Sequence, residues 1–206
     1  NAQTYLDQFF KVVDKARTEV RWNGDWFKPM SFVEILRLAS RLTVARMLER
    51  DDFEKRYKAG EPISIHEFLY PLMQAYDSVV VRADVEIGAT EQKFNLLAGR
   101  DIQSAYGVEP QVILTLPVLE GLDGVRRMSK SLGNYIGIAE PPKEIYGKVM
   151  SLPDNLVETY FVSATRVSLP EVTLLLEKQE PRDLKMRLAR EIVALYHGKA
   201  AAKKAE

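Results

Sequence analysis

The chain has 206 residues, and its 29 lysine and arginine residues balance 29 aspartate and glutamate residues, so its formal net charge is zero. This balance argues against a strongly basic nucleic-acid-binding tail, although a local basic face remains compatible with it. The absence of cysteine excludes disulfides, thiolate nucleophiles and cysteine-based zinc sites, and we expect a cytoplasmic protein. No apolar run approaches the roughly 18 residues of a membrane span, so no membrane partner is expected.

The N-terminal third of the chain is predicted to be mostly helical. Apolar residues at helical spacing predict a helix over 4–20. An Asn-Gly pair between aromatic and branched residues predicts a short hairpin over 19–27. A capping box that begins at Ser31 opens a predicted helix over 31–49, and the charged stretch 49–61 is expected to be exposed.

The middle of the chain predicts a βαβ unit. A second capping box, at Ser64, starts a helix that is expected to end near Asp77. The apolar run 79–87 predicts a strand buried on both faces, and a helix over 88–106 and a second buried strand over 112–116 follow. Strand, helix and strand in this order predict a parallel sheet and an α/β fold.

The C-terminal part, from Pro141, is predicted to be helices separated by prolines. Pro153, Pro170 and Pro181 each stand where a first-turn proline belongs. The last helix is expected over 182–197, followed by a small, basic tail.

Three polar residues of the third predicted helix share one face. Tyr70, Gln74 and Asp77 are spaced at i, i+4 and i+7, so a hydroxyl, an amide and a carboxylate converge. Such a face can bind a small zwitterion with a polar tip, and a solvent-facing polar face is the simpler alternative. Pro71 favours binding, since a proline kept inside a helix suggests a shaped kink.

The turn after the first strand is a second candidate site. Gly88 stands at the carboxyl end of a predicted strand and is followed by a polar helix start. Ligands of open α/β sheets bind outside this end of the strands, where helix N-termini offer free N–H groups. An ordinary turn capped by Thr90 is the alternative.

A loop over 121–134 combines glycines, cations and hydroxyls after the second strand. Flexible backbone and mobile cations suit a site that grips phosphates and later releases pyrophosphate. The glycine and lysine spacing is not that of a P-loop, and a basic surface loop is the alternative.

The motifs together resemble a known family. Arg127-Met128-Ser129-Lys130-Ser131 is similar to the KMSKS signature of class I aminoacyl-tRNA synthetases, with arginine in the first place. With the Tyr70, Gln74 and Asp77 pattern and the run 88–95, in this order, the stretch from about Arg17 to Gly198 resembles bacterial tyrosyl-tRNA synthetases.

The resemblance implies the second half of a Rossmann-like nucleotide-binding domain with a parallel sheet, followed by an all-helical domain. We expect the first domain over 1–138, with a connecting insertion over 1–62 and the KMSKS-type loop over 125–134. The helical domain is expected over 139–206.

The implied activity is the ATP-dependent conversion of L-tyrosine to tyrosyl-adenylate and its transfer to tRNA(Tyr). ATP with Mg²⁺ would be a substrate, with no tightly bound cofactor, no DNA partner and a homodimeric assembly. The chain begins without methionine, and His66 and His197 stand outside any HIGH signature. We therefore expect a partial chain that is inactive alone.

The resemblance also implies roles for individual residues. Tyrosine would be bound by Tyr70 and Gln74 at its amino group, by Asp77 at its phenol, and by Gln92. The residues implied for ATP and adenylate binding are Gly88, Ala89, Glu91, Val118, Leu119, Met128 and Lys130. The residues implied for catalysis are Lys130, Arg127 and Ser129, and no metal ligand is expected. The family usually has glycine, aspartate and lysine where this chain has Ala89, Glu91 and Arg127.

Two other interpretations compete with this one. A tryptophanyl-tRNA synthetase shares the fold, and it is disfavoured by Gln74 and by the continuation Asn95-Leu96-Leu97. A non-catalytic binding module is disfavoured because Gln74, Asp77, Ser129 and Lys130 are all retained.

Overall fold

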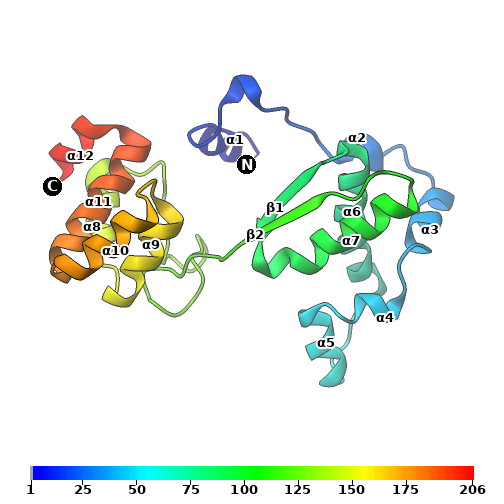
Figure 1. Ribbon diagram of the computed structural model, residues 1–206. Coiled ribbons are helices and arrows are strands. Elements are labelled where there is room, and N and C mark those ends of the chain that lie inside the picture. Colours follow the sequence, from blue (N-terminus) through cyan, green and yellow to red (C-terminus); the bar gives the residue numbers. More distant parts are fainter. Residues whose placement is uncertain (1) are drawn as a thin grey trace. The chain divides into compact units, whose positions relative to one another are not determined.

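The computed structural model describes residues 2–206 and divides into two compact units (Figure 1). One unit is Val20–Pro117, and the other joins Val118–Glu206 to the N-terminal residues up to Glu19. None of the helices in the described part of the chain is long and apolar enough to cross a membrane.

The unit Val20–Pro117 contains a small sheet and six helices. Its elements are α2 (Gly24–Phe27), α3 (Phe32–Ala39), α4 (Val44–Met47), α5 (Asp51–Lys58), α6 (Leu69–Val81), β1 (Val85–Ala89), α7 (Lys93–Ala105) and β2 (Val112–Leu116). Short 3-10 turns cover Ile65–Phe68 and Thr90–Gln92.

The predicted βαβ unit is confirmed. β1 and β2 pair in parallel, in register from Val85 with Val112 to Ala89 with Leu116. The crossover helix α7 contacts both strands, and α6 packs along α7 (Figure 1). Gly107, with φ at +70°, follows the end of α7 as predicted.

The prediction that both strands are buried on both faces was wrong for one face. Successive residues of a strand face opposite sides of the sheet, and the residues that face the helices include Glu86 and Gly88. The large apolar side chains of the opposite face are between 49% and 64% exposed, namely Val85, Ile87, Val112, Leu114 and Leu116. The helices of this unit cover only the first face.

The predicted strand over 79–87 also began too early. Val79–Val81 are the last turn of α6, which ends at Arg82 in a left-handed conformation, with φ at 53°. A run of branched apolar residues suits a buried helix turn as well as a strand. Here the packing of Val79 on the α6–α7 core decides for helix.

Two predictions for the N-terminal third were wrong. The hairpin over 19–27 is the helical turn α2, because Asn23 has helical φ and ψ of −66° and −18°. A hairpin turn of the Asn-Gly type needs positive φ at both positions. The helix over 31–49 is interrupted, and Thr43 caps a separate short helix, α4. Its start is as predicted, since Ser31 and Glu34 form a capping box.

The charged stretch 49–61 is exposed on one side only. It forms α5, whose Phe53 is 1% exposed and packs against Phe68 with ring centroids 4.9 Å apart. Arg56 binds both carboxylate oxygens of Glu67, at 2.6 and 3.0 Å. This contact, with the Ser64 N–H, lowers the pKa of Glu67 to about 2.

The helical unit has a single continuous core. Its helices are α1 (Ala2–Phe9), α8 (Pro142–Met150), α9 (Val157–Ala164), α10 (Leu169–Lys178), α11 (Pro181–His197) and α12 (Lys199–Ala205), with 3-10 turns at Lys15–Arg17 and Asp154–Leu156. The core side chains that are fully buried include Ile145, Val149, Phe161, Leu188 and Val193.

The helix starts of this unit follow the prolines. Pro170 and Pro181 stand in the first turns of α10 and α11, and Pro153 precedes a 3-10 turn. The expected basic tail is instead the helix α12, because Ala202 packs into the core. The helix predicted over 4–20 ends at Phe9.

The compact units divide the chain elsewhere than at the predicted domain boundary of 138/139. The segment between β2 and α8 packs on the helical core through the partly buried side chains of Leu119, Leu122, Met128 and Ile136. By its packing, this segment therefore belongs to the helical unit.

Candidate active site

Helix α6 carries the first group of candidate residues. Tyr70, Gln74 and Asp77 share one face, on which Tyr70 is 60% exposed and the other two are half-buried. Pro71 is the third residue of α6, in the first turn, where the helix needs no N–H from it.

Asp77 is held by two donors from the α2 region. Its carboxylate accepts hydrogen bonds from the Trp26 indole Nε1 at 2.9 Å and the Asn23 amide Nδ2 at 3.3 Å. Burial raises the pKa of Asp77, and these two donors partly oppose that shift. A carboxylate has about four acceptor positions, so Asp77 can accept a further donor such as a phenol.

Trp26 and Asn23 are functional candidates that sequence reasoning missed. They lie 51 and 54 residues from Asp77 along the chain, so no local spacing reveals the contact. Asn23 belongs to the Asn-Gly pair and Trp26 follows it by two residues, and this pair is typical of a hairpin turn rather than of a binding site.

Asn95 joins two predicted tyrosine-binding residues. Its side-chain amide donates to Gln74 Oε1 and to Gln92 Oε1, each at 2.9 Å. Asn95 is 2% exposed, and its Oδ1 makes no hydrogen bond within residues 2–206. The structure therefore brings Gln74 and Gln92 together at one point between α6 and α7.

The carboxyl end of β1 carries the second group. Gly88 faces α7 so closely that an added Cβ would lie 3.1 Å from a methyl carbon of Leu96. Ala89 ends the strand, and Glu91 lies in the following 3-10 turn. Thr90 caps neither this turn nor α7 with its side chain, so the simple capped-turn alternative does not describe the segment.

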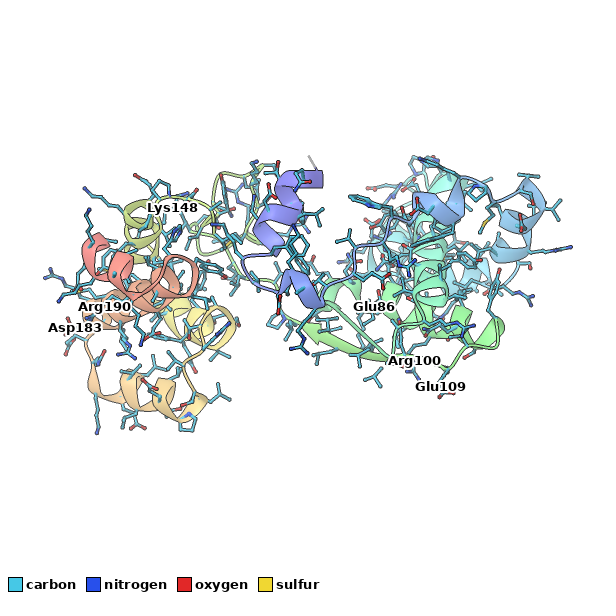
Figure 2. The ribbon with its side chains drawn as sticks, turned by 90° about the horizontal axis from the view of Figure 1, so that it is seen from above. Glu86, Arg100, Glu109, Lys148, Asp183 and Arg190 are labelled. Carbon is cyan, nitrogen blue, oxygen red and sulfur yellow. The ribbon has the colours of Figure 1, made fainter. Side chains whose placement is uncertain are left out.

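A buried polar network fixes α6 against the sheet. The Ser78 hydroxyl donates to Glu86 at 2.8 Å, and the Gln111 side-chain amide also donates to Glu86. The Gln103 amide donates to the Ser78 carbonyl at 3.2 Å. Figure 2 labels Glu86, which comes from β1. The network anchors the residue next to Asp77, and it was not foreseen from the sequence.

The third group lies in the helical unit, on the loop after β2. Glu120 and Arg127 form an antiparallel bridge, flanked by backbone bonds from Gly121 to Arg126 and from Met128 to Leu119, both 2.8 Å. Val118 and Leu119 precede this bridge.

The segment from Ser129 to Ser131 carries an exposed lysine. Ser129 and Ser131 share a hydroxyl–hydroxyl bond of 2.8 Å. Lys130, between them, is exposed, and its side chain makes no hydrogen bond or ion pair with the described residues. A lysine in this state is available to an anionic ligand.

A cavity of about 600 Å³ in the helical unit includes Lys130 in its wall. Its other lining residues are neutral, namely Thr4, Tyr5, Gln8, Phe9, Val12, Tyr135, Ile136, Gly137 and Ile138. In residues 2–206 no group of three or more histidine, aspartate or glutamate side chains is placed to hold a metal ion.

The chain matches one protein family over its whole length. The family model of tRNA synthetases class I (W and Y) matches residues 1–206. A tyrosine–tRNA ligase of Moorella thermoacetica is 58% identical over 211 residues, covering 100% of this chain and 51% of that protein. A tyrosine–tRNA ligase of Francisella tularensis is 56% identical, covering 100% of this chain and 53% of that protein.

A solved structure shares the fold. The tyrosyl-tRNA synthetase of Archaeoglobus fulgidus, complexed with L-tyrosine, aligns with a TM-score of 0.75 at 24% identity, covering 99% of this chain and 71% of that one. The expected α/β fold, a Rossmann-like fragment with a parallel sheet, is confirmed. The chain spans about half the length of the curated relatives it matches.

Proposed function

Because this chain belongs to the class I tRNA synthetases of the tryptophan and tyrosine group, we propose that it forms part of a tyrosine–tRNA ligase. The enzyme activates L-tyrosine with ATP to tyrosyl-adenylate and transfers the tyrosyl group to tRNA(Tyr). The observation that carries tyrosine specificity is the half-buried Asp77 carboxylate, held by Trp26 and Asn23 with acceptor positions to spare. Relatives that are 58% and 56% identical carry the name tyrosine–tRNA ligase, which supports the choice over tryptophan.

The substrate groups match the chemistry of the residues on α6 and α7. Tyr70 and Gln74 offer oxygen acceptors to the ammonium group, and Asp77 accepts a hydrogen bond from the phenol. The Nε2 amide of Gln92, whose Oε1 is bound to Asn95, has no hydrogen-bond partner in residues 2–206 and can donate to a carboxylate or phosphate oxygen.

The loop supplies positive charge where pyrophosphate leaves. Lys130 contacts the ATP phosphates, with Arg127 and Ser129 beside it, and charge that develops on the departing oxygens is stabilised. ATP enters as its Mg²⁺ complex. The residues that we propose for binding ATP and the adenylate, besides Lys130, are Gly88, Ala89 and Glu91 at the β1 turn, and Val118, Leu119 and Met128 in the segment after β2.

The exposed apolar face of the β1–β2 sheet supports completion by a further segment. Parallel sheets are normally covered on both faces, and five large apolar side chains lie open here. We propose that the other half of the nucleotide-binding domain, which carries a HIGH signature, covers this face. The present chain is then inactive alone.

In functional terms, residues 1–138, with the insertion over 1–62 and the loop over 125–134, belong to the catalytic half, and 139–206 form the helical domain. The full protein acts in the cytoplasm, where its substrates are, as a homodimer. Exposed apolar side chains of the insertion, such as Phe32, Val33 and Leu36, support a protein interface there.

Amino-acid-dependent exchange of pyrophosphate into ATP tests the function. The full-length protein should exchange with tyrosine at least about a hundredfold faster than with phenylalanine, which has no donor for the carboxylate. It should also prefer tyrosine to tryptophan, in line with the names of its relatives. Exchange with tryptophan as fast as with tyrosine would contradict the tyrosine assignment and favour a tryptophanyl-tRNA synthetase. No exchange with any amino acid would support the non-catalytic module.

A further inference from the structure

The Asn134 side chain makes four hydrogen bonds at the KMSKS-type loop. We propose that it acts with Asp123 as a positioning pair that fixes the backbone from which Lys130 reaches the phosphates. This inference rests on the proposed function, in which Lys130 is the group that meets pyrophosphate.

The Asn134 amide is bonded at both ends. Its Nδ2 donates to Asp123 Oδ2 at 2.9 Å, to the Arg127 carbonyl at 3.2 Å and to the Arg126 carbonyl at 3.4 Å. Its Oδ1 accepts the backbone N–H of Ser129 at 2.8 Å. Backbone carbonyls only accept and a backbone N–H only donates, so these partners fix the orientation of the amide.

The side chain is also sequestered. Asn134 is 5% exposed, although it lies in a loop whose neighbouring residues Leu132 and Gly133 are exposed. An added Cβ on Gly121 would lie 2.3 Å from the Asn134 Nδ2, so the amide occupies space that only a glycine leaves open. The backbone O of Asn134 in turn accepts the Leu122 N–H at 2.9 Å.

Asp123 holds the other side of the pair. Its Oδ1 accepts the backbone N–H groups of Arg126 at 2.9 Å and Val125 at 3.2 Å, and its Oδ2 accepts the Arg126 guanidinium at 2.9 Å. The Arg126 backbone N–H is the main reason that the pKa of Asp123 is lowered to about 2. At neutral pH the carboxylate is therefore ionised and a strong acceptor for the Asn134 amide.

The consequence falls on Lys130. The hydrogen bond to the Ser129 N–H holds the backbone one residue before Lys130, while the Lys130 side chain has no partner in the described residues. Because the backbone is fixed, the flexible Lys130 side chain can place its ammonium group only within a small region around the phosphates. Loss of that bond frees the backbone, and a displacement of about 1 Å at a reacting group can slow a reaction about 100-fold.

The test uses the full-length protein with Asn134→Asp, Asn134→Ala and the control Val125→Ala. Asn134→Asp keeps the shape and the acceptor but loses the donor and places a second carboxylate beside Asp123. Val125 is in the same loop, and its side chain is 81% exposed. Single-turnover formation of tyrosyl-adenylate should fall about 10–100-fold in both Asn134 variants. The dissociation constant for tyrosine should stay within twofold, and the control should match wild type.

Limited trypsin digestion gives a readout that does not depend on activity. Cleavage after Arg126, Arg127 and Lys130 should be at least about fivefold faster in the Asn134 variants, since an unfastened loop opens more often. The double variant Asp123→Asn with Asn134→Asp exchanges the two groups, so that an amide donor at position 123 again faces a carboxylate acceptor at position 134. It should recover part of the activation rate that Asn134→Asp alone loses.

Three results would overturn the proposal. Activation and cleavage rates within twofold of wild type in both Asn134 variants would show that the pair does not set the loop. An equal loss of tyrosine binding and of activation would show general damage rather than positioning. If the fold reduction in activation rate of the double variant equals the product of the fold reductions of Asp123→Asn and Asn134→Asp, the two residues do not act together. A wild-type protein without exchange activity would contradict the proposed function, and the trypsin comparison would still test the pair.

Discussion

Replacing Asp77 by asparagine should separate substrate specificity from stability. The change keeps the shape of the side chain and removes the charge that reads the phenol. A hydrogen bond to a charged group contributes about 1.5–3 kcal/mol, which at about 1.4 kcal/mol per factor of ten corresponds to roughly 10–150-fold. We expect the preference for tyrosine over phenylalanine to fall by that factor in Asp77→Asn.

The stability of the Asp77→Asn variant should rise or stay unchanged, although its specificity falls. Burial raises the pKa of Asp77, so the ionised form is disfavoured in the folded state. An acid whose folded pKa is raised contributes a stability term that is present below the unfolded value of about 3.9 and is lost as pH rises through the folded value. The neutral asparagine carries no such cost, and its Oδ1 can still accept the Trp26 indole. The midpoint of thermal unfolding at pH 7 should therefore not fall.

The assay is pyrophosphate exchange with tyrosine and with phenylalanine in the full-length protein, beside thermal unfolding of the same samples. Asp84→Asn is the matched control, because Asp84 is exposed in the same unit. A tyrosine preference as strong as that of wild type would show that Asp77 does not read the phenol. A large fall in the unfolding midpoint would show that the carboxylate is mainly structural.

Three further changes test other parts of the structure. Lys130→Ala should slow adenylate formation about 10²–10³-fold with little change in tyrosine affinity, and an unchanged single-turnover rate would refute its role. Gly99→Ala should cost about 1–3 kcal/mol in urea unfolding, because the new Cβ would lie 2.8 Å from the Gln111 amide nitrogen. An unchanged unfolding midpoint would show that the Gln111 and Ser78 side chains move aside for the new methyl group at little energetic cost. Glu67 has a pKa of about 2 beside Arg56, so its stabilising contribution is complete above the unfolded value of about 4.3 and is lost as pH falls toward 2. Glu67→Gln should flatten the acid decline of stability in that window, and an unchanged acid limb would contradict the ion pair.

Local patterns predicted the parts of the fold that local physics decides. The Ser31–Glu34 capping box and the first-turn prolines of α10 and α11 are where the sequence placed them, since each needs only neighbouring residues. The parallel pairing of β1 and β2 followed from the strand–helix–strand order.

The errors occurred where distant contacts decide the structure. The Asn-Gly pair at 23–24 is helical, and nearby Trp26 binds Asp77, which is 51 residues away. The apolar run 79–87 has no period that separates helix from strand, so the packing of α6 on α7 set the boundary.

The candidate site could be predicted only in part. The polar face of α6, the β1 turn and the exposed Lys130 were identified from their motifs. The residues that hold them, Asn95 and Asn134, gave no separate signal because their partners are backbone groups or side chains up to 21 residues away.

The most direct test of the proposed function is charging of tRNA by the full-length protein. Total bacterial tRNA would be incubated with ATP, Mg²⁺ and labelled tyrosine or tryptophan, and the label in acid-precipitable tRNA would be counted over time. We expect tyrosine to be attached to tRNA and tryptophan to remain in solution. Attachment of tryptophan, or of neither amino acid while the protein is folded, would contradict the proposed function.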